Sequence, residues 1–99
     1  PSSEEYGGPA PFSEPESRLL RDLAREWHPH AYTNVHSGEW AIYAPWDHKR
    51  LWGSRLPSDT STLLERLNAH CGCVHGAAGS VSGYLAFGTS MDYMYEELK

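Results

Sequence analysis

Soft metal ligands and thiols are concentrated in one six-residue window of this 99-residue chain. The run His70-Cys71-Gly72-Cys73-Val74-His75 holds both cysteines and two of the six histidines. Thiolate sulfur and imidazole nitrogen are the ligands that zinc prefers, but adjacent His70 and Cys71 cannot both reach one ion at the usual ligand spacing. A zinc site in this window would therefore use Cys71, Cys73 and His75. The fourth ligand would be one of three histidines elsewhere in the chain: His28, His30 or His48.

Two other interpretations of the same window stay open. In the first, Cys71 and Cys73 close a small redox-active disulfide, although a preceding helix C-terminus would raise the pKa of a thiol and disfavour the reactive thiolate. In the second, Gly72 is a left-handed helix cap and the cysteines are reduced, small apolar residues. We favour the capping interpretation, in which the chain has no cofactor, and keep zinc as the alternative.

A predicted β-hairpin offers a second set of polar residues. Residues Ala31 to His36 and Glu39 to Ala44 alternate in polarity around the turn Ser37-Gly38. A two-residue turn would place Val35 opposite Trp40 on an apolar face. The other face would present aromatic and hydrogen-bonding groups suited to contacting another protein: Tyr32, Asn34, His36, Glu39 and Tyr43.

The turn after this hairpin carries the positive charge in the middle of the chain. Trp46 and Trp52 flank Lys49 and Arg50, so the turn could add Trp46, Lys49 and Arg50 to the partner-binding surface. A third interpretation is a small enzyme or enzyme subunit that uses His36 and Glu39 as an acid–base pair. No nucleophile elbow, phosphate-binding glycine loop or His-Glu-x-x-His helix accompanies that pair, so we predict no catalytic residues.

Composition limits the class of partner. Thirteen acidic residues against eight basic ones give a formal charge of −5, which makes a nucleic acid an improbable partner because phosphate binding needs a clustered basic surface. The longest apolar stretch is far shorter than a membrane span requires. We therefore expect a soluble, cytoplasmic protein.

The order of predicted elements indicates the α+β class, with a single domain over residues 13–99 after a flexible arm over residues 1–12. A helix follows Ser13-Glu14-Pro15-Glu16 and stops at His28-Pro29. After the hairpin come a third strand over Arg50 to Ser54 and a second helix from Pro57-Ser58-Asp59 to about His70. The order is α-β-β-β-α-β-α, with a small, mainly antiparallel sheet and the helices on one side. The remaining elements are a fourth strand over Val81 to Phe87 and a last helix from Ser90 that places Met91, Met94, Tyr95 and Leu98 on one face.

These patterns favour a small non-catalytic binding or regulatory protein that contacts another protein through the hairpin face and the tryptophan-flanked turn. The alternative is a zinc-binding protein with its site in residues 70–75. An undocked last helix would favour a homodimer, because its apolar face would then need a partner.

Overall fold

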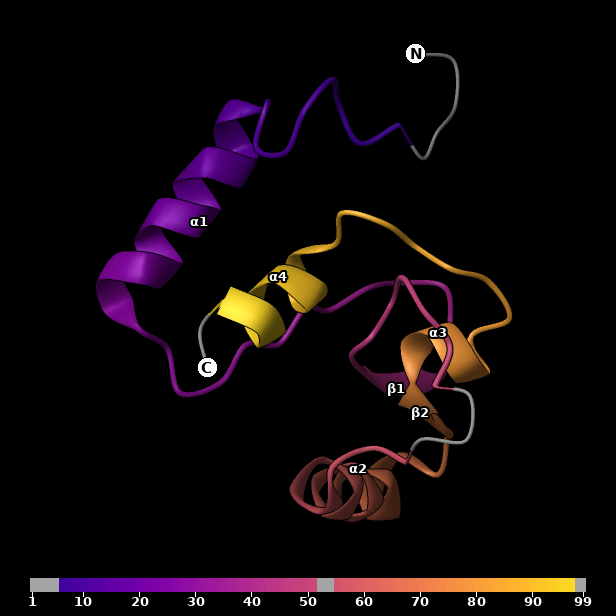
Figure 1. Cartoon of the computed structure of the whole chain (residues 1–99). Coiled ribbons are helices and arrows are strands. Elements are labelled where there is room, and N and C mark those ends of the chain that lie inside the picture. Colours follow the sequence, from indigo (N-terminus) through magenta and orange to yellow (C-terminus); the bar gives the residue numbers. More distant parts are fainter. Residues whose placement is uncertain (1–5, 52–54, 98–99) are drawn as a thin grey trace.

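The computed structural model describes residues 6–51 and 55–97. Figure 1 shows α1 on one side of the molecule, the two strands on the other, and α4 between them. The elements in chain order are α1 (Pro15–Trp27), β1 (Ala41–Ala44), α2 (Ser58–Cys71), β2 (Val74–Ala77), α3 (Ala78–Val81) and α4 (Ser90–Glu97).

The three longer helices confirm the helical predictions. Pro15 occupies the first position of α1, where its missing N–H costs no hydrogen bond. The helix ends at Trp27, and the backbone N–H of His28 donates to the Ala24 carbonyl from a left-handed conformation. The second helix, α2, ends at Cys71, and Gly72 caps it with φ 61°, as the capping interpretation predicts.

The sheet differs from the prediction. It contains two parallel strands, β1 and β2, in a register that pairs Ala41 with Val74 and Ala44 with Ala77. Parallel neighbours need a crossover connection, and α2 lies within it. The antiparallel hairpin is therefore wrong: β1 begins only at Ala41, and residues 31–40 form no strand. The described chain is mixed α/β rather than a helix-covered antiparallel sheet.

The predicted inner face of the hairpin is also exposed. Val35 is 86% exposed and Trp40 is 73% exposed, so neither belongs to a core among the described residues. Polar and apolar residues do alternate over residues 31–36. This local pattern does not determine whether a strand pairs with its neighbour or with a strand some 30 residues away. Here β1 pairs with the distant strand because α2 returns the chain beside it.

The predicted fourth strand is absent, and most of the predicted third strand lies outside the described residues. Val81 is the last residue of α3, and residues 82–87 after it form bends and irregular backbone instead of a fourth strand. Residues 50–51 are not in a strand, while Trp52 and the remainder of the predicted third strand lie outside the described residues. Leu98, assigned to the face of the last helix, also lies outside them.

A close backbone contact explains why α3 forms at the end of β2. The N–H of Gly79 donates to the carbonyl of Trp46 over 2.8 Å. A side chain at Gly79 would collide with the carbonyl oxygen of Lys49 and come within 2.9 Å of that of Trp46. Glycine is required there because the turn that follows β1 passes directly over the helix.

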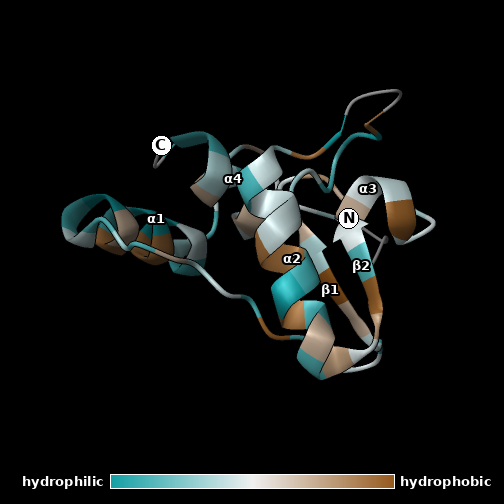
Figure 2. Cartoon of the chain, turned by 90° about the horizontal axis from the view of Figure 1, so that it is seen from below, coloured by the Kyte–Doolittle hydropathy of each residue, from teal (hydrophilic) through white to brown (hydrophobic). Residues whose placement is uncertain are grey.

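The buried apolar residues are few, and each of the six elements contributes one of them. Most of them are alanines, while large apolar side chains on α1 and α2 stay exposed. Figure 2 shows the hydrophobic positions of these helices in brown. In the described part of the chain, no helix is long and apolar enough to cross a membrane. The buried apolar residues are Ala24, Ala44, Leu64, Ala77, Ala78 and Met94.

Candidate functional site

Three segments that are distant in sequence meet at the start of α4. They are residues 32–36, the turn 46–48 that follows β1, and the first turn of α4 with the residue before it. We call the polar residues that meet there the α4 cluster. Its members are Tyr32, Asn34, Asp47, His48, Thr89, Ser90 and Asp92.

Asp92 is the centre of this cluster. It is 8% exposed, and its Oδ1 accepts a hydrogen bond from the backbone N–H of Asp47 over 2.9 Å. Its Oδ2 accepts from the backbone N–H of His48 over 3.1 Å and lies 2.6 Å from the Nδ1 of the same residue. A buried carboxylate needs such donors to replace water, and the N-terminal end of a helix also favours its negative charge. Asp92 therefore holds the 46–48 turn against α4.

The same hydrogen bonds orient the His48 ring. An ionised carboxylate can only accept, so the Nδ1 of His48 donates to Asp92. In the neutral imidazole the Nε2 then carries the lone pair, an arrangement that lets histidine accept a proton or bind a metal. The His48 side chain is 36% exposed, and its ring also lies edge-on to Trp46 at 5.2 Å.

Asp47 supplies a second carboxyl group to the cluster. Burial raises the pKa of Asp47, a hydrogen bond from Thr89 opposes the shift, and the charge of Asp92 adds to it. His36 and His48 both lie close enough to lower this pKa through their positive charge. The exposed His36 therefore belongs to the surroundings of the cluster. Together these groups form a histidine–carboxylate arrangement that can transfer protons or support a metal ion.

Two residues of the segment before β1 contact the start of α4. The hydroxyl groups of Tyr32 and Ser90 are hydrogen-bonded over 2.8 Å. The side-chain amide of Asn34 donates to the same Ser90 oxygen over 3.5 Å. Tyr32 and Asn34, predicted to bind a partner, thus use these polar groups within the chain.

The remaining residues predicted for partner binding lie in or near β1 and the turn after it. Burial and the neighbouring carboxylate of Glu39 raise the pKa of Tyr43, which lies in β1. Trp46 packs its ring edge-on against Tyr95, and the Nζ of Lys49 lies 4.2 Å from the Trp46 ring centre. The positively charged turn predicted from the sequence is thus packed through Trp46, and Arg50 beside it is exposed. Partner binding by this set stays a prediction.

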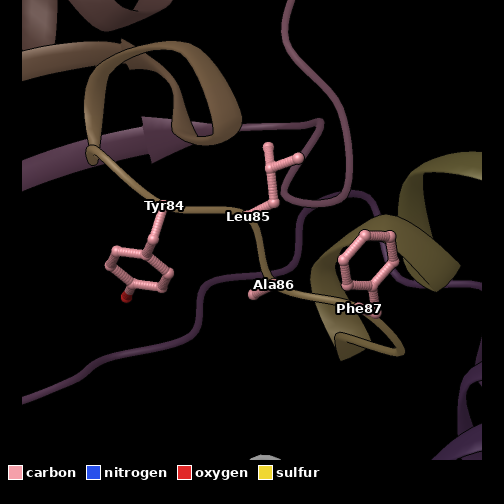
Figure 3. A pocket seen from close by; sticks show the side chains of 4 residues that line it. All are labelled: Tyr84, Leu85, Ala86 and Phe87. Carbon is pink, nitrogen blue, oxygen red and sulfur yellow. The ribbon is translucent and has the colours of Figure 1, made fainter.

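A shallow aromatic recess lies next to the α4 cluster. Its volume is about 410 Å³, and Tyr84, Leu85, Ala86 and Phe87 line it. Tyr84 is 60% exposed and Phe87 is 74% exposed, and Figure 3 shows Tyr84 and Leu85 pointing to opposite sides of the backbone. The backbone N–H of Ala86 donates to the carbonyl of Asp47 over 3.1 Å, which ties the recess to the cluster.

The cysteine window contains a disulfide. Cys71 and Cys73 are bonded, so the expectation of reduced cysteines is wrong for this structure and the two sulfurs are not available as thiolate ligands in this form. No group of three or more histidine, cysteine, aspartate or glutamate side chains that could hold a metal ion occurs among residues 6–51 and 55–97. A zinc site at Cys71, Cys73 and His75 stays a prediction.

Sequence reasoning missed Asp47, Ser90 and Asp92. The adjacent Asp47 and His48 and the first-turn position of Asp92 were visible signals, since helix N-termini favour acidic residues. Nothing local connects these residues, which are 44 and 45 positions apart. Only the tertiary contact converts an ordinary turn and an ordinary helix start into one cluster.

Comparison with known proteins identifies related sequences. The zinc carboxypeptidase family model matches residues 1–99. Carboxypeptidase B2 from Rattus norvegicus and that from Mus musculus are each 36% identical over 104 residues, which cover 95% of this chain and 24% of the relative. Carboxypeptidase B2 from Bos taurus is 34% identical over the same coverage. No solved structure matches the chain. The chain thus spans about a quarter of the length of these relatives.

These relationships overturn the functional prediction. A match along the whole chain to a family of zinc peptidases contradicts the interpretation as a small non-catalytic binding or regulatory protein. They support the zinc alternative over the expectation of no cofactor, although the family description names the metal and not its ligands. The prediction of a non-catalytic protein failed because it depended on finding a complete catalytic motif within this chain.

Proposed function

The chain belongs to the zinc carboxypeptidase family, and we propose that it forms part of the catalytic domain of a zinc peptidase that removes residues from the C-terminal end of peptides. The observation that carries this proposal is the α4 cluster, where His36, Asp47 and the His48–Asp92 pair lie beside an exposed aromatic recess. Histidine nitrogen and carboxylate oxygen are suitable donors for a catalytic zinc ion.

His36 is the residue that we propose as a zinc ligand. Its side chain is exposed, and no hydrogen bond joins it to another described residue. It lies close enough to Asp47 for its positive charge to lower the pKa of that carboxyl group. The other imidazole near Asp47 belongs to His48. We propose that His48 holds the turn, because Asp92 accepts hydrogen bonds from both its backbone N–H and its ring.

The complete zinc site needs further ligands. Catalytic zinc usually has three protein ligands and one position for water or substrate. The described residues contain no group of three suitable side chains. Because the chain spans about a quarter of its relatives, we assign the missing ligands to the remainder of the full-length protein. When bound, zinc lowers the pKa of a water molecule and polarises a carbonyl group.

The aromatic recess is a suitable contact for the peptide substrate. Tyr84 and Phe87 expose aromatic surface beside Asp47, and Ser82 and Asp47 hold the backbone that carries them. Aromatic side chains supply a large contact area, and the tyrosine hydroxyl adds a hydrogen-bonding group. We propose that this recess contacts the substrate next to the zinc ion.

Exposed apolar surface supports the view that the chain is one part of a larger domain. Leu23 and Trp27 are 54% and 74% exposed on α1, and Leu63 is 56% exposed on α2. A helix normally buries its apolar face against another element. We propose that parts of the full-length protein outside this chain cover these faces.

The direct test uses the full-length protein and a peptide with a free C-terminus. We expect release of the C-terminal residue, no release from the same peptide with an amidated C-terminus, and loss of release when a chelator removes zinc. Release that persists after complete zinc removal would contradict the proposed function.

The ligand assignment is tested by comparing two histidine variants. His36→Ala should lower the zinc content of the purified full-length protein at least tenfold relative to wild type, because a metal ligand is lost. His30→Ala is the matched control, since His30 is also exposed and lies before the same segment. Equal zinc content in both variants would remove His36 from the proposed site.

A further inference from the structure

We propose that Cys71, Cys73 and His75 form a second, redox-controlled site, which binds a soft divalent metal ion only after the disulfide is reduced. The site lies at the junction of α2 and β2 and uses none of the residues assigned to the peptidase. Its existence does not depend on the proposed peptidase function.

The first support is the position of the disulfide. Cys71 and Cys73 are two positions apart, with Cα atoms separated by 5.2 Å. Their side chains are half-buried, and Gly72 between them is exposed with no atom within 4 Å of the position of a side chain. A small reductant can therefore approach the bond. A disulfide that closes so short a loop also constrains the unfolded chain less than one that closes a long loop.

The second support is that hydrogen bonds hold both cysteine backbones independently of the sulfur atoms. The N–H of Gly72 donates to the Asn68 carbonyl over 2.7 Å, and the N–H of Cys73 donates to the Asn68 side-chain oxygen over 2.8 Å. The indole N–H of Trp40 donates to the Cys71 carbonyl over 3.2 Å. These bonds keep the two residues close after reduction, so the thiols stay neighbours.

The third support is the orientation of His75. Its Nδ1 lies 3.2 Å from the carbonyl oxygen of Cys73. A carbonyl oxygen can only accept, so Nδ1 donates and Nε2 of the neutral ring carries the lone pair. The ring is exposed and is anchored to the residue that supplies one of the sulfurs. This second hydrogen bond is the kind that fixes the tautomer of metal-binding histidines.

Reduction changes the chemistry of this group of residues completely. A dithiol reductant attacks one sulfur as its thiolate, forms a mixed disulfide and leaves as its own cyclic disulfide. Two electrons and two protons are transferred, so that Cys71 and Cys73 become thiols and the reductant is oxidised. Metal binding then releases both thiol protons and gives two thiolate ligands and one imidazole, a set that selects zinc and softer ions. In the disulfide form neither sulfur is available as a thiolate.

The experiment measures metal binding by the full-length protein with and without prior reduction. Cadmium is the probe, because cadmium thiolates absorb in the ultraviolet and are detected without measuring peptidase activity. After treatment with a dithiol and removal of the reductant under anaerobic conditions, we expect one additional cadmium ion per chain with thiolate absorbance. The oxidised protein should show neither.

Matched variants separate the site from general surface binding. His75→Ala should weaken cadmium binding by the reduced protein about tenfold, the lower end of the effect of losing a metal-site group. His70→Ala is the control, since His70 is exposed, adjacent to Cys71 and excluded by ligand spacing, and it should bind as wild type. Cys73→Ser should abolish the thiolate absorbance, and alkylation of the reduced wild type should do the same without a substitution.

Three results would overturn the proposal. The first is a disulfide that resists the dithiol while the protein is folded. The second is a reduced protein that gains two free thiols but no cadmium. The third is equal cadmium binding by the His75→Ala and His70→Ala variants.

Discussion

The α4 cluster and α1 differ in how far their side chains find contacts within the chain. In the cluster, Asp92 is 8% exposed and accepts hydrogen bonds from a turn more than 40 residues away. In α1, Leu23 and Trp27 are more than half exposed, although the helix is strongly amphipathic. The difference teaches that the buried carboxylate of Asp92 finds its hydrogen-bond donors within this chain, whereas the apolar side chains of α1 stay exposed in it.

The largest expected effect comes from breaking the cluster at Asp92. Asp92→Ala should lower the free energy of unfolding of the full-length protein by about 4 kcal/mol, because it leaves two buried N–H donors and His48 without their acceptor. Denaturant unfolding measures this loss.

Asp22→Ala is the control for that substitution. The carboxylate of Asp22 also pairs with a basic side chain, Arg21, but it is 62% exposed. Because solvent screens an exposed pair, Asp22→Ala should leave the stability close to that of the wild type. Similar losses of unfolding free energy in the two variants would contradict a larger stabilising contribution from the buried contacts of Asp92.

A smaller effect is expected on α1. Leu23→Ser combined with Trp27→Ser should lower the stability of the full-length protein by about 2–3 kcal/mol, because we expect other parts of that protein to cover these side chains. Glu26→Ser, at an exposed polar position of the same helix, serves as the control. A change within about 0.5 kcal/mol in the double variant would place this face in solvent and contradict the covering of α1.

The smallest effect concerns the pH dependence of stability. Burial raises the pKa of Asp47 in the folded state, so the folded protein binds this proton more tightly than the unfolded chain does. The contribution of Asp47 to the free energy of unfolding is therefore fully present below about pH 4, near the pKa of the unfolded chain. It is lost as the pH rises through the pKa of the folded protein.

Asp47→Asn should remove this pH dependence and leave the protein slightly more stable than wild type at neutral pH. Unfolding midpoints measured from pH 3 to pH 7 would reveal it. A wild-type protein that gains stability relative to the variant as the pH rises would reverse the sign assigned to the Asp47 shift.

Helices were predictable and strand pairing was not. The beginning of α1 at Pro15 and the cap of α2 at Gly72 follow from local chemistry, since proline suits the first turn and glycine adopts a left-handed conformation. The β1 strand needs β2, a partner 33 positions along the chain, and the alternation around Ser37-Gly38 indicated a nearer one. Local periodicity identifies residues that suit a strand but not the strand that pairs with them.

The candidate site shows the same division. His36 was identified as chemically competent, but it was paired with Glu39 across a hairpin that does not form. Its described electrostatic neighbour is Asp47, held by the contacts between the 46–48 turn and α4. The described residues contain no complete set of metal ligands, so the proposed zinc site could not be completed from them.

The sequence by itself determined the helices, their caps and the proximity of Cys71, Cys73 and His75, because each depends on residues within a few positions of one another. Only the tertiary structure decided the parallel pairing of β1 with β2 and the meeting of Asp47, His48 and Asp92. The physical reason is that pairing and buried hydrogen bonds depend on which distant segments pack together. That choice is made by the burial of whole helix and strand faces, which no local pattern contains.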